Sequence, residues 1–194
     1  QAGFNEMVGG LRERERLHDL FGRQVGHDVA RLAIERGVTL GGETRDVAVL
    51  FIDIVGSTSM AAERPATEVV ALLNRFFEVV VEITDQHGGF VNKFEGDAAL
   101  CIFGAPLPRE DAPGDALRAA RDLHETLRRA VPELDAAIGV SAGAAVAGNI
   151  GSAARFEYTV IGDPVNEASR LTELAKSRPG RVLASATVVD RARA

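Results

Sequence analysis

The chain of 194 residues contains no tryptophan, one tyrosine and one cysteine, and aromatic residues make up only 5% of it. A single cysteine excludes an internal disulfide, and Cys101 stands in an apolar run where a small buried side chain is expected. The four histidines are scattered without the spacing of a zinc site. No run of about twenty apolar residues is present that could cross a membrane. The core is therefore expected to be built from aliphatic side chains.

Basic residues are outnumbered by acidic ones. Lys and Arg together number 22 against 28 Asp and Glu, for a net charge of −6. An acidic chain lacks the positive surface that attracts a phosphate backbone, so no nucleic-acid partner is expected. Hydrophobic residues make up 46% of the chain. This is enough to bury the core of one domain of roughly 150 residues that carries an appendage.

Two carboxylates interrupt apolar strand patterns. Asp53 stands in Val-Leu-Phe-Ile-Asp-Ile (residues 49–54), and Asp97 ends Lys-Phe-Glu-Gly-Asp (residues 93–97). A buried charge is costly unless a partner or a metal compensates it, so the pair predicts a shared cation. Taken singly, each residue has a simpler interpretation. Asp53 could cap the following turn, and Asp97 could be an ordinary hairpin residue.

Small residues follow the first carboxylate. Gly56, Ser57 and Thr58 form a predicted turn between the strand and a long helical pattern. Backbone N–H groups lie free at the start of a helix and can bind a phosphate, beside a metal that the preceding carboxylate holds. These three residues are therefore predicted to contact a substrate that carries phosphate.

The segment Tyr-Thr-Val-Ile-Gly-Asp-Pro-Val-Asn-Glu-Ala-Ser-Arg-Leu (residues 158–171) follows a glycine-rich stretch at residues 139–151. Together with Phe-Ile-Asp-Ile-Val-Gly-Ser-Thr (residues 51–58) and the motif at residues 93–97, it resembles the catalytic domain of the class III nucleotidyl cyclases. The resemblance extends from about residue 46 to the end of the chain. Four motifs stand in the family's order, with the two Asp residues 44 positions apart (97 − 53).

The resemblance implies a reaction and a metal site. In this family the 3′-hydroxyl of a nucleoside triphosphate attacks its own α-phosphorus and expels pyrophosphate, beside two divalent ions. Asp53 and Asp97 match the metal ligands, and the backbone carbonyl of Ile54 is the third expected protein ligand. Oxygen ligands of this kind suit two Mg²⁺ or Mn²⁺ ions.

Lys93 matches the family position that reads the base. A Lys can donate a hydrogen bond to N1 of adenine, whereas guanine carries a proton there, so the resemblance implies ATP as substrate. The partner position, often Asp in the family, is Thr159, whose hydroxyl can accept from the adenine amino group but can also donate. A solvated hairpin lysine is the alternative for Lys93. Adenylate cyclase is the leading interpretation, and guanylate cyclase is its closest competitor.

Asn166 and Arg170 are four positions apart, so a helix that begins near Pro164 would present them on one face. The resemblance implies that they orient the ribose and stabilise charge that develops on the phosphates. The donor fork of Arg suits this task. The alternative interpretation is an early-turn Asn and a surface cation.

In such cyclases one subunit supplies the metal ligands, and the other supplies the base-reading residues and the Asn and Arg. This chain carries both sets, so the resemblance implies a homodimer with two equivalent sites and an inactive monomer. A catalytically silent module that dimerises or senses nucleotide remains an alternative, although all the site residues are intact. A diguanylate cyclase would need Gly-Gly-Asp/Glu-Glu-Phe where this hairpin reads Glu-Gly-Asp-Ala.

Residues 1–43 are predicted to be a separate element. Phe21, Val25, Val29 and Leu32 recur at helical spacing after a charged stretch. Residues 4–14 resemble the end of a HAMP signalling module and the helix that connects it to a cyclase. An amphipathic helix that packs on the domain is the alternative. The HAMP interpretation predicts the cytoplasmic domain of a parent protein that is anchored in the cell membrane by upstream segments.

Residues 44–194 are predicted to be an α+β catalytic domain. The order βαββαβ is that of a ferredoxin-like sheet with helices on one face, as the family resemblance also implies. Helices are expected at residues 66–86, 111–130 and from 164 onward, and later strands near residues 136–145, 156–160 and 181–184. The family usually continues with final strands that carry a basic residue for the triphosphate. No match to them follows residue 184, so the domain is expected to lack its last strands.

Overall fold

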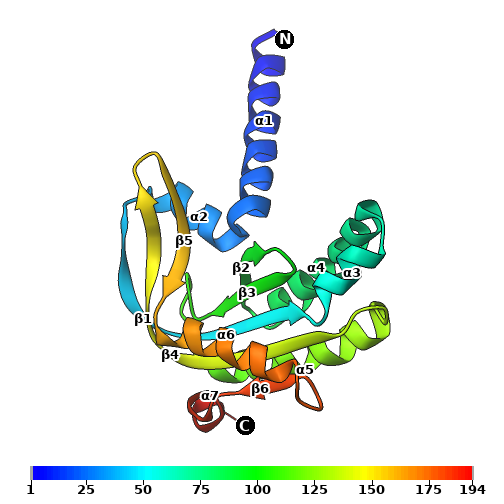
Figure 1. Cartoon of the computed structure of the whole chain (residues 1–194). Coiled ribbons are helices and arrows are strands. Elements are labelled where there is room, and N and C mark those ends of the chain that lie inside the picture. The colour runs from blue at the N-terminus through cyan, green and yellow to red at the C-terminus, as the bar shows by residue number, and fades with distance from the viewer. Residues whose placement is uncertain (1, 194) are drawn as a thin grey trace. The chain divides into compact units, whose positions relative to one another are not determined.

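A computed structural model of the chain describes the backbone of residues 2–193 and the side chains of residues 13–193. The chain divides into two compact units, one formed by Gln1–Gly42 with Gly148–Thr159 and the other by Glu43–Ala147 with Val160–Ala194. The elements follow in the order shown in Figure 1. The helices are α1 (Ala2–Val25), α2 (His27–Arg36), α3 (Ser57–Glu63), α4 (Ala66–Gln86), α5 (Ala112–Ala130), α6 (Asp163–Ala175) and α7 (Ala186–Arg191). The strands are β1 (Gly41–Ile54), β2 (Phe90–Glu95), β3 (Ala98–Phe103), β4 (Ala136–Ser152), β5 (Arg155–Ile161) and β6 (Val182–Ala184).

The strands of the described chain form one sheet with the order β2-β3-β1-β4-β5, in which β6 pairs with β4. β3 is antiparallel to both β1 and β2, and β6 is parallel to β4. In this register Ala98 of β3 lies opposite Asp53 of β1 on one side and opposite Glu95 of β2 on the other. The turn between β2 and β3 therefore lies beside the end of β1 that carries Asp53.

Helices α4 and α5 pack together and cover one face of the sheet. Every second side chain of a strand points to the same face, and Ala48, Leu50 and Ile52 of β1 are fully buried. They belong to one hydrophobic cluster with Phe76 of α4 and Leu123 of α5. This aliphatic core, with few aromatic rings, agrees with the composition.

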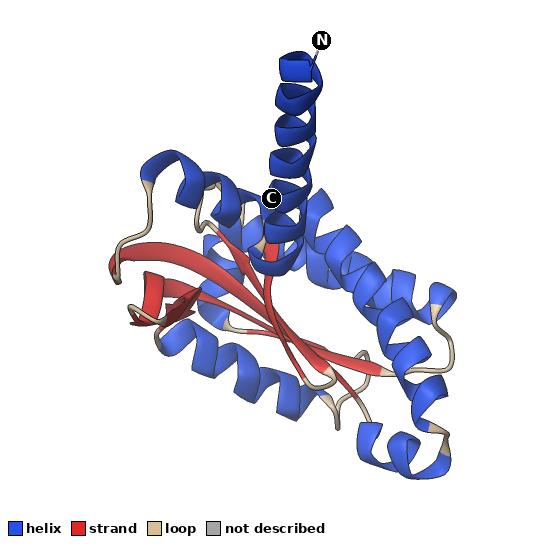
Figure 2. Cartoon of the chain, turned by 90° about the horizontal axis from the view of Figure 1, so that it is seen from above, coloured by secondary structure: helices blue, strands red, loops and turns tan. Residues whose placement is uncertain are grey.

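The opposite face of the same sheet carries α6. Gly139 of β4 has no room for a side chain, because a Cβ there would lie 2.2 Å from the carbonyl oxygen of Ala168. The hydroxyl of Thr172 donates to the backbone carbonyl of Phe51 at 3.0 Å, which fastens α6 to β1. Figure 2 shows the strands in red with helices on both sides. The predicted helices on one face are confirmed as α4 and α5, and α6 is added on the other face because Gly139 lets its backbone approach.

The predicted helix boundaries hold, whereas the predicted β4 is too short. Helix α5 starts one residue after Asp111, whose side chain caps it by accepting a hydrogen bond from the backbone of Gly114 at 3.1 Å. Strand β4 continues to Ser152 instead of ending near residue 145. Its glycines permit a close approach of backbones instead of breaking the strand. A Cβ at Gly148 would lie 2.1 Å from the carbonyl oxygen of Gly41.

The smaller unit contains α1, α2 and the adjoining parts of β4 and β5. Gly26, with a φ of 92°, separates α1 from α2. The apolar residues expected to share one helical face are therefore divided between two helices, with Phe21 exposed on α1 and Val29 buried on α2. The side chain of Asn149 donates to the carbonyl of Thr39 at 3.2 Å in this unit. A helix with the length and hydropathy to cross a membrane does not occur within the described residues.

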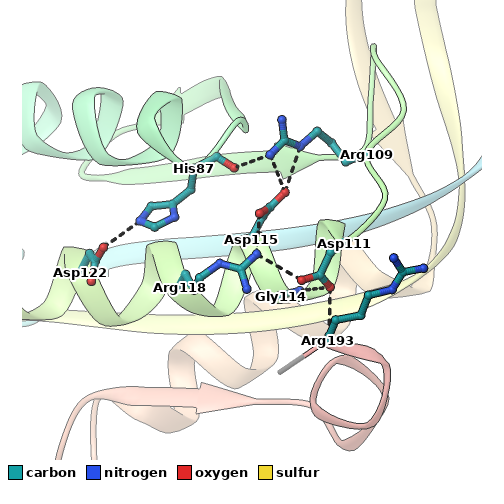
Figure 3. A network of polar contacts seen from close by, with 8 residues as sticks. All are labelled: His87, Arg109, Asp111, Gly114, Asp115, Arg118, Asp122 and Arg193. Atoms are coloured by element: carbon teal, nitrogen blue, oxygen red, sulfur yellow. Dashed lines mark hydrogen bonds and ion pairs between the residues drawn. The ribbon is translucent and has the colours of Figure 1, made fainter.

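A network of ion pairs joins the start of α5 to the end of the described chain (Figure 3). Arg118 lies 3.1 Å from Asp111 and 2.7 Å from Asp115, and Arg109 lies 2.8 Å from Asp115. The backbone N–H of Arg193 donates to Asp111 at 3.1 Å. Burial alone would raise the pKa of Asp111, but hydrogen bonds from Arg193, Arg118 and the start of α5 lower it below its usual value.

Candidate active site

Asp53 lies near the end of β1 on the sheet face opposite the hydrophobic core. Its neighbours Ile52 and Ile54 point into the core, so the alternation of side chains turns Asp53 to the face that α6 covers. Its carboxylate is only 21% exposed. A partly buried carboxylate at the end of a strand requires compensation from a nearby cation.

Asp97 comes from the two-residue turn, Gly96-Asp97, that joins β2 to β3. Gly96 has a φ of 67°, which glycine adopts without strain. Because Asp53 lies opposite Ala98, this turn brings the Asp97 carboxylate against that of Asp53. Burial raises the pKa of Asp53 and the Asp97 carboxylate raises it further, while Lys176 only partly offsets the two. The surroundings of Asp53 thus disfavour its charged form on balance.

Lys176 completes this cluster and was not predicted from the sequence. Its ammonium lies 2.7 Å from Asp53 Oδ2 and 2.8 Å from Glu173 Oε2. The hydrogen bond to Asp53 is the main cause that raises the pKa of Lys176. The guanidinium of Arg181 donates to the backbone carbonyl of Lys176 just past the end of α6. Lys176 and Asp53 are 123 positions apart (176 − 53), so no local motif signals the contact, and only the packing of α6 on the sheet creates it.

The predicted phosphate turn directly follows β1. Gly56 has a φ of 74°, and α3 begins at Ser57 with no side chain that caps its first turn. The carbonyl of Gly56 accepts from the backbone of Met60 at 3.1 Å. Ser57 is half-buried and Thr58 is exposed. The turn has the expected position next to Asp53, and its contact with a substrate stays a prediction.

Lys93 lies on the same sheet face as Asp53. It is opposite Leu100 of β3, and Leu100 is opposite Phe51 of β1. Directly opposite residues share a face, and so do residues two apart on one strand. Lys93 is therefore two strands from Asp53, about 10 Å across the sheet at the usual strand spacing. Thr159 is buried on β5 and belongs to the smaller unit. The roles of both residues in reading a base stay predictions.

Asn166 and Arg170 are exposed on α6, one turn apart as predicted. Ala168 lies two positions after Asn166, and Thr172 lies two positions after Arg170. Both Ala168 and Thr172 are buried against the sheet. A step of two residues is more than half a turn of an α-helix. Asn166 and Arg170 therefore point away from the sheet face that carries Asp53, and the fold of one chain does not direct them toward the two carboxylates.

The carboxylate pair fits divalent cations as part of a larger ligand set. Within the described part of the chain, no group of three or more His, Cys, Asp or Glu side chains is placed to hold a metal ion. Asp53 and Asp97 would therefore need further oxygen ligands. The side chain of Ile54 is buried, so only its backbone could contribute, and phosphate oxygens of a substrate could supply the rest. Such oxygen donors suit Mg²⁺ or Mn²⁺.

The structure thus brings together a carboxylate of β1, Asp53, and one of the β2–β3 turn, Asp97, next to the turn that opens α3. Residues 41–193 match the adenylate and guanylate cyclase catalytic domain. The chain belongs to this family of nucleotide cyclase catalytic domains.

Two uncharacterized proteins of Mycobacterium tuberculosis are similar to this chain. Rv1318c of Mycobacterium tuberculosis is 61% identical over 193 residues, which cover 99% of this chain and 36% of that protein. Rv1320c of the same species is 59% identical, over 95% of this chain and 33% of that protein. The chain thus spans about a third of the length of the curated relatives it matches.

Solved structures of both adenylyl and guanylyl cyclases are similar to this chain. A bacterial light-regulated adenylyl cyclase has a TM-score of 0.82 at 27% identity, covering 100% of this chain and 59% of the other. The guanylyl cyclase Cya2 has a TM-score of 0.74 at 31% identity, covering 80% of this chain and 82% of the other. A non-canonical dimeric guanylyl cyclase domain of the RhoGC fusion protein from Blastocladiella emersonii has a TM-score of 0.69 at 25% identity. It covers 77% of this chain and 84% of the other. The likeness establishes a cyclase domain and leaves its base specificity to the residues of the site.

Proposed function

We propose that this domain is an adenylate cyclase, which converts ATP to 3′,5′-cyclic AMP and pyrophosphate in signal transduction. The observation that carries the proposal is the apposed pair Asp53 and Asp97 next to the turn that opens α3. Membership of the cyclase family supports the reaction class. Lys93 supports ATP over GTP, because an ammonium can donate to the unprotonated N1 of adenine.

Asp53, Asp97 and the backbone carbonyl of Ile54 would hold two divalent cations, Mg²⁺ or Mn²⁺, which when bound activate the attacking hydroxyl oxygen and neutralise charge on the phosphates. The turn at Gly56, Ser57 and Thr58 follows directly on these ligands. Its backbone N–H groups would bind phosphate oxygens at the start of α3 and align the triphosphate.

Two residues of α6 would act on the reacting part of the substrate. Arg170 would donate its fork of N–H groups to phosphate oxygens and stabilise the charge that develops there. Asn166, one turn earlier, would orient the ribose so that its 3′-oxygen lies in line with the α-phosphorus.

A homodimer with shared sites is part of the proposal. Asn166 and Arg170 project away from the sheet face of their own carboxylates, so a second copy of the chain would supply them. One subunit would contribute Asp53 and Asp97, and the other would contribute Lys93, Thr159, Asn166 and Arg170. A related guanylyl cyclase domain has been solved as a non-canonical dimer, which supports the formation of a dimer and not a particular arrangement of its sites.

Guanylate cyclase is the second candidate. Thr159 stands where the family often has Asp, and a hydroxyl can donate as well as accept, so it can also pair with the guanine carbonyl. The likeness to solved guanylyl cyclases supports keeping this alternative. A silent module that dimerises or senses nucleotide is the remaining one.

Residues 1–43 would transmit a signal to the catalytic domain at residues 44–194. The exposed apolar side chains Leu17, Leu20 and Phe21 of α1 offer a surface for the same helix of a second subunit. In this proposal they continue a HAMP-type module of a longer, membrane-anchored parent, with the cyclase on the cytoplasmic side.

Product formation tests the proposal. The purified chain is supplied with ATP or GTP and Mn²⁺ over protein concentrations that span dimerisation. Cyclic AMP at a rate that rises faster than linearly with protein concentration is the expected result. Cyclic GMP as the main product would instead identify a guanylate cyclase. A confirmed dimer that makes neither product would contradict both and leave the silent module.

A further inference from the structure

We propose that Lys176 is an internal counter-cation of the metal site. It occupies Asp53 in the metal-free protein, is displaced from it when a divalent cation binds, and so sets the metal concentration at which the site fills. The inference rests on the metal-binding role of Asp53 and Asp97 in the proposed function. It adds a residue of another element, which acts on the metal site by competition.

The Lys176 ammonium occupies one oxygen of the carboxylate that would bind a metal. It lies 2.7 Å from Asp53 Oδ2, on the carboxylate that also faces Asp97. A divalent cation that coordinates the same oxygen needs that volume and is repelled by the ammonium charge at short range. Lys176 and a metal ion therefore cannot both bind Asp53 Oδ2 at the same time.

The pair is more enclosed than an ordinary surface ion pair. The side chains of Lys176 and Asp53 are 27% and 21% exposed, whereas those of the Arg23–Asp19 pair on α1 are 70% and 50% exposed. Water screens a partly buried pair less, so its contribution exceeds that of a fully exposed one. Removing the lysine charge should thus have a measurable effect on cation binding.

The displaced ammonium has a second carboxylate within reach. Glu173 Oε2 lies 2.8 Å from Lys176 Nζ, and its side chain is 73% exposed. The backbone of Lys176 is held by the guanidinium of Arg181. The side chain can therefore release Asp53 and remain paired with Glu173 while the end of α6 stays in place. This second partner lowers the free energy needed to free Asp53.

The test measures Mn²⁺ binding by isothermal titration calorimetry of the full chain without nucleotide. Lys176→Met removes the charge and keeps an unbranched apolar side chain, and Lys176→Arg keeps the charge. Arg178→Met changes the net charge equally at an exposed position two residues on. We expect Lys176→Met to bind Mn²⁺ about three- to tenfold more tightly, the size expected for a partly screened ion pair. Lys176→Arg and Arg178→Met should bind as the wild type does.

A double-mutant cycle with Glu173→Gln tests the second carboxylate. The loss of Mn²⁺ affinity caused by Glu173→Gln should be larger in the wild-type background than in Lys176→Met, because only the former has an ammonium to accommodate. Equal losses in the two backgrounds would overturn this role of Glu173. Melting temperatures in EDTA check that each variant is folded, and Lys176→Gln replaces Lys176→Met if the latter is not.

The outcomes separate the inference from the proposed function. Unchanged or weaker Mn²⁺ binding by Lys176→Met, with clear binding by the wild type, overturns the inference and leaves the metal site standing. An equal gain in Mn²⁺ affinity in Arg178→Met would show that the effect comes from the net charge of the chain, and would also overturn the inference. Absence of Mn²⁺ binding in every variant would overturn the metal site itself.

Discussion

Two pairs of aspartates in this domain have opposite electrostatic environments. Asp111 and Asp115 at the start of α5 are surrounded by Arg109 and Arg118 and by backbone N–H donors, and the pKa of Asp111 is lowered. Asp53 and its neighbour Asp97 have one nearby lysine, and burial and mutual repulsion raise the pKa of Asp53. The first pair stabilises the fold, whereas the second remains short of positive charge.

The difference shows how a structural and a functional acidic cluster can be told apart. A carboxylate whose hydrogen bonds are complete within its own chain has no need of a ligand. A half-buried carboxylate held against another is stable only at a cost, and such sites are where cations bind. This difference supports the proposal that the β2–β3 turn, and not the start of α5, carries the chemistry.

The largest expected difference between the clusters is in catalysis. Asp53→Ala should lower cyclic AMP formation at least about a hundredfold, of the order that loss of one charge-stabilising group costs. Asp111→Ala should stay within about twofold of the wild type at temperatures where it is folded, because only the fold depends on it. Initial rates with Mn²⁺ and ATP measure both. A comparable loss in Asp111→Ala that persists in the folded protein would contradict the assignment.

The second difference is that the catalytic cluster should need a partner chain. Mixing Asp53→Ala with Arg170→Ala subunits should restore up to about a quarter of wild-type activity, since half of the dimers would have one intact site out of two. Mixing Asp53→Ala with Asp97→Ala is the matched control and should restore nothing, because both changes fall on the same half of the site. No recovery in the first mixture, with heterodimers shown to be present, would rule out shared sites.

The smallest difference is in stability. Asp111→Ala should lower the free energy of unfolding by about 1–2 kcal/mol, mainly through the lost cap of α5. Asp53→Ala should change it by less than about 0.5 kcal/mol, because relief of burial and repulsion offsets the lost contact with Lys176. Urea denaturation in EDTA at neutral pH measures both. A larger destabilisation by Asp53→Ala would show that the Lys176 pair is mainly structural.

The dependence of these stability differences on pH should have opposite signs. The folded-state pKa of Asp111 is lowered, so its contribution is present above the usual carboxyl pKa and is lost as the pH falls through the lowered value. The folded-state pKa of Asp53 is raised, so its contribution is present below the usual pKa and is lost as the pH rises through the raised value. As the pH falls, the difference in free energy of unfolding between the wild type and Asp111→Ala should shrink. The free energy of unfolding of the wild type should rise relative to that of Asp53→Ala.

Much of this domain could be read from local patterns. Apolar periodicity predicted helices at residues 66–86 and 111–130, and both are confirmed as α4 and α5. The extent of β4 was underestimated because its glycines suggest turns, yet they serve the close approach of neighbouring backbones. The interruption at Gly26 was missed because the helical spacing of apolar residues continues across it.

The sequence by itself determined the element order and the cyclase family, because apolar periodicity and short motifs are local patterns. It predicted that Asp53 and Asp97 meet if the Asp53 strand pairs beside the hairpin, and the structure shows this pairing of β1 with β3. Tertiary structure alone decided that α6 packs on the face of Asp53, which turns Asn166 and Arg170 away from it and brings Lys176 onto it. The physical reason is that a helix's place on a sheet depends on side-chain volumes far apart in the chain. Here that volume is the missing side chain of Gly139, which no local pattern could reveal.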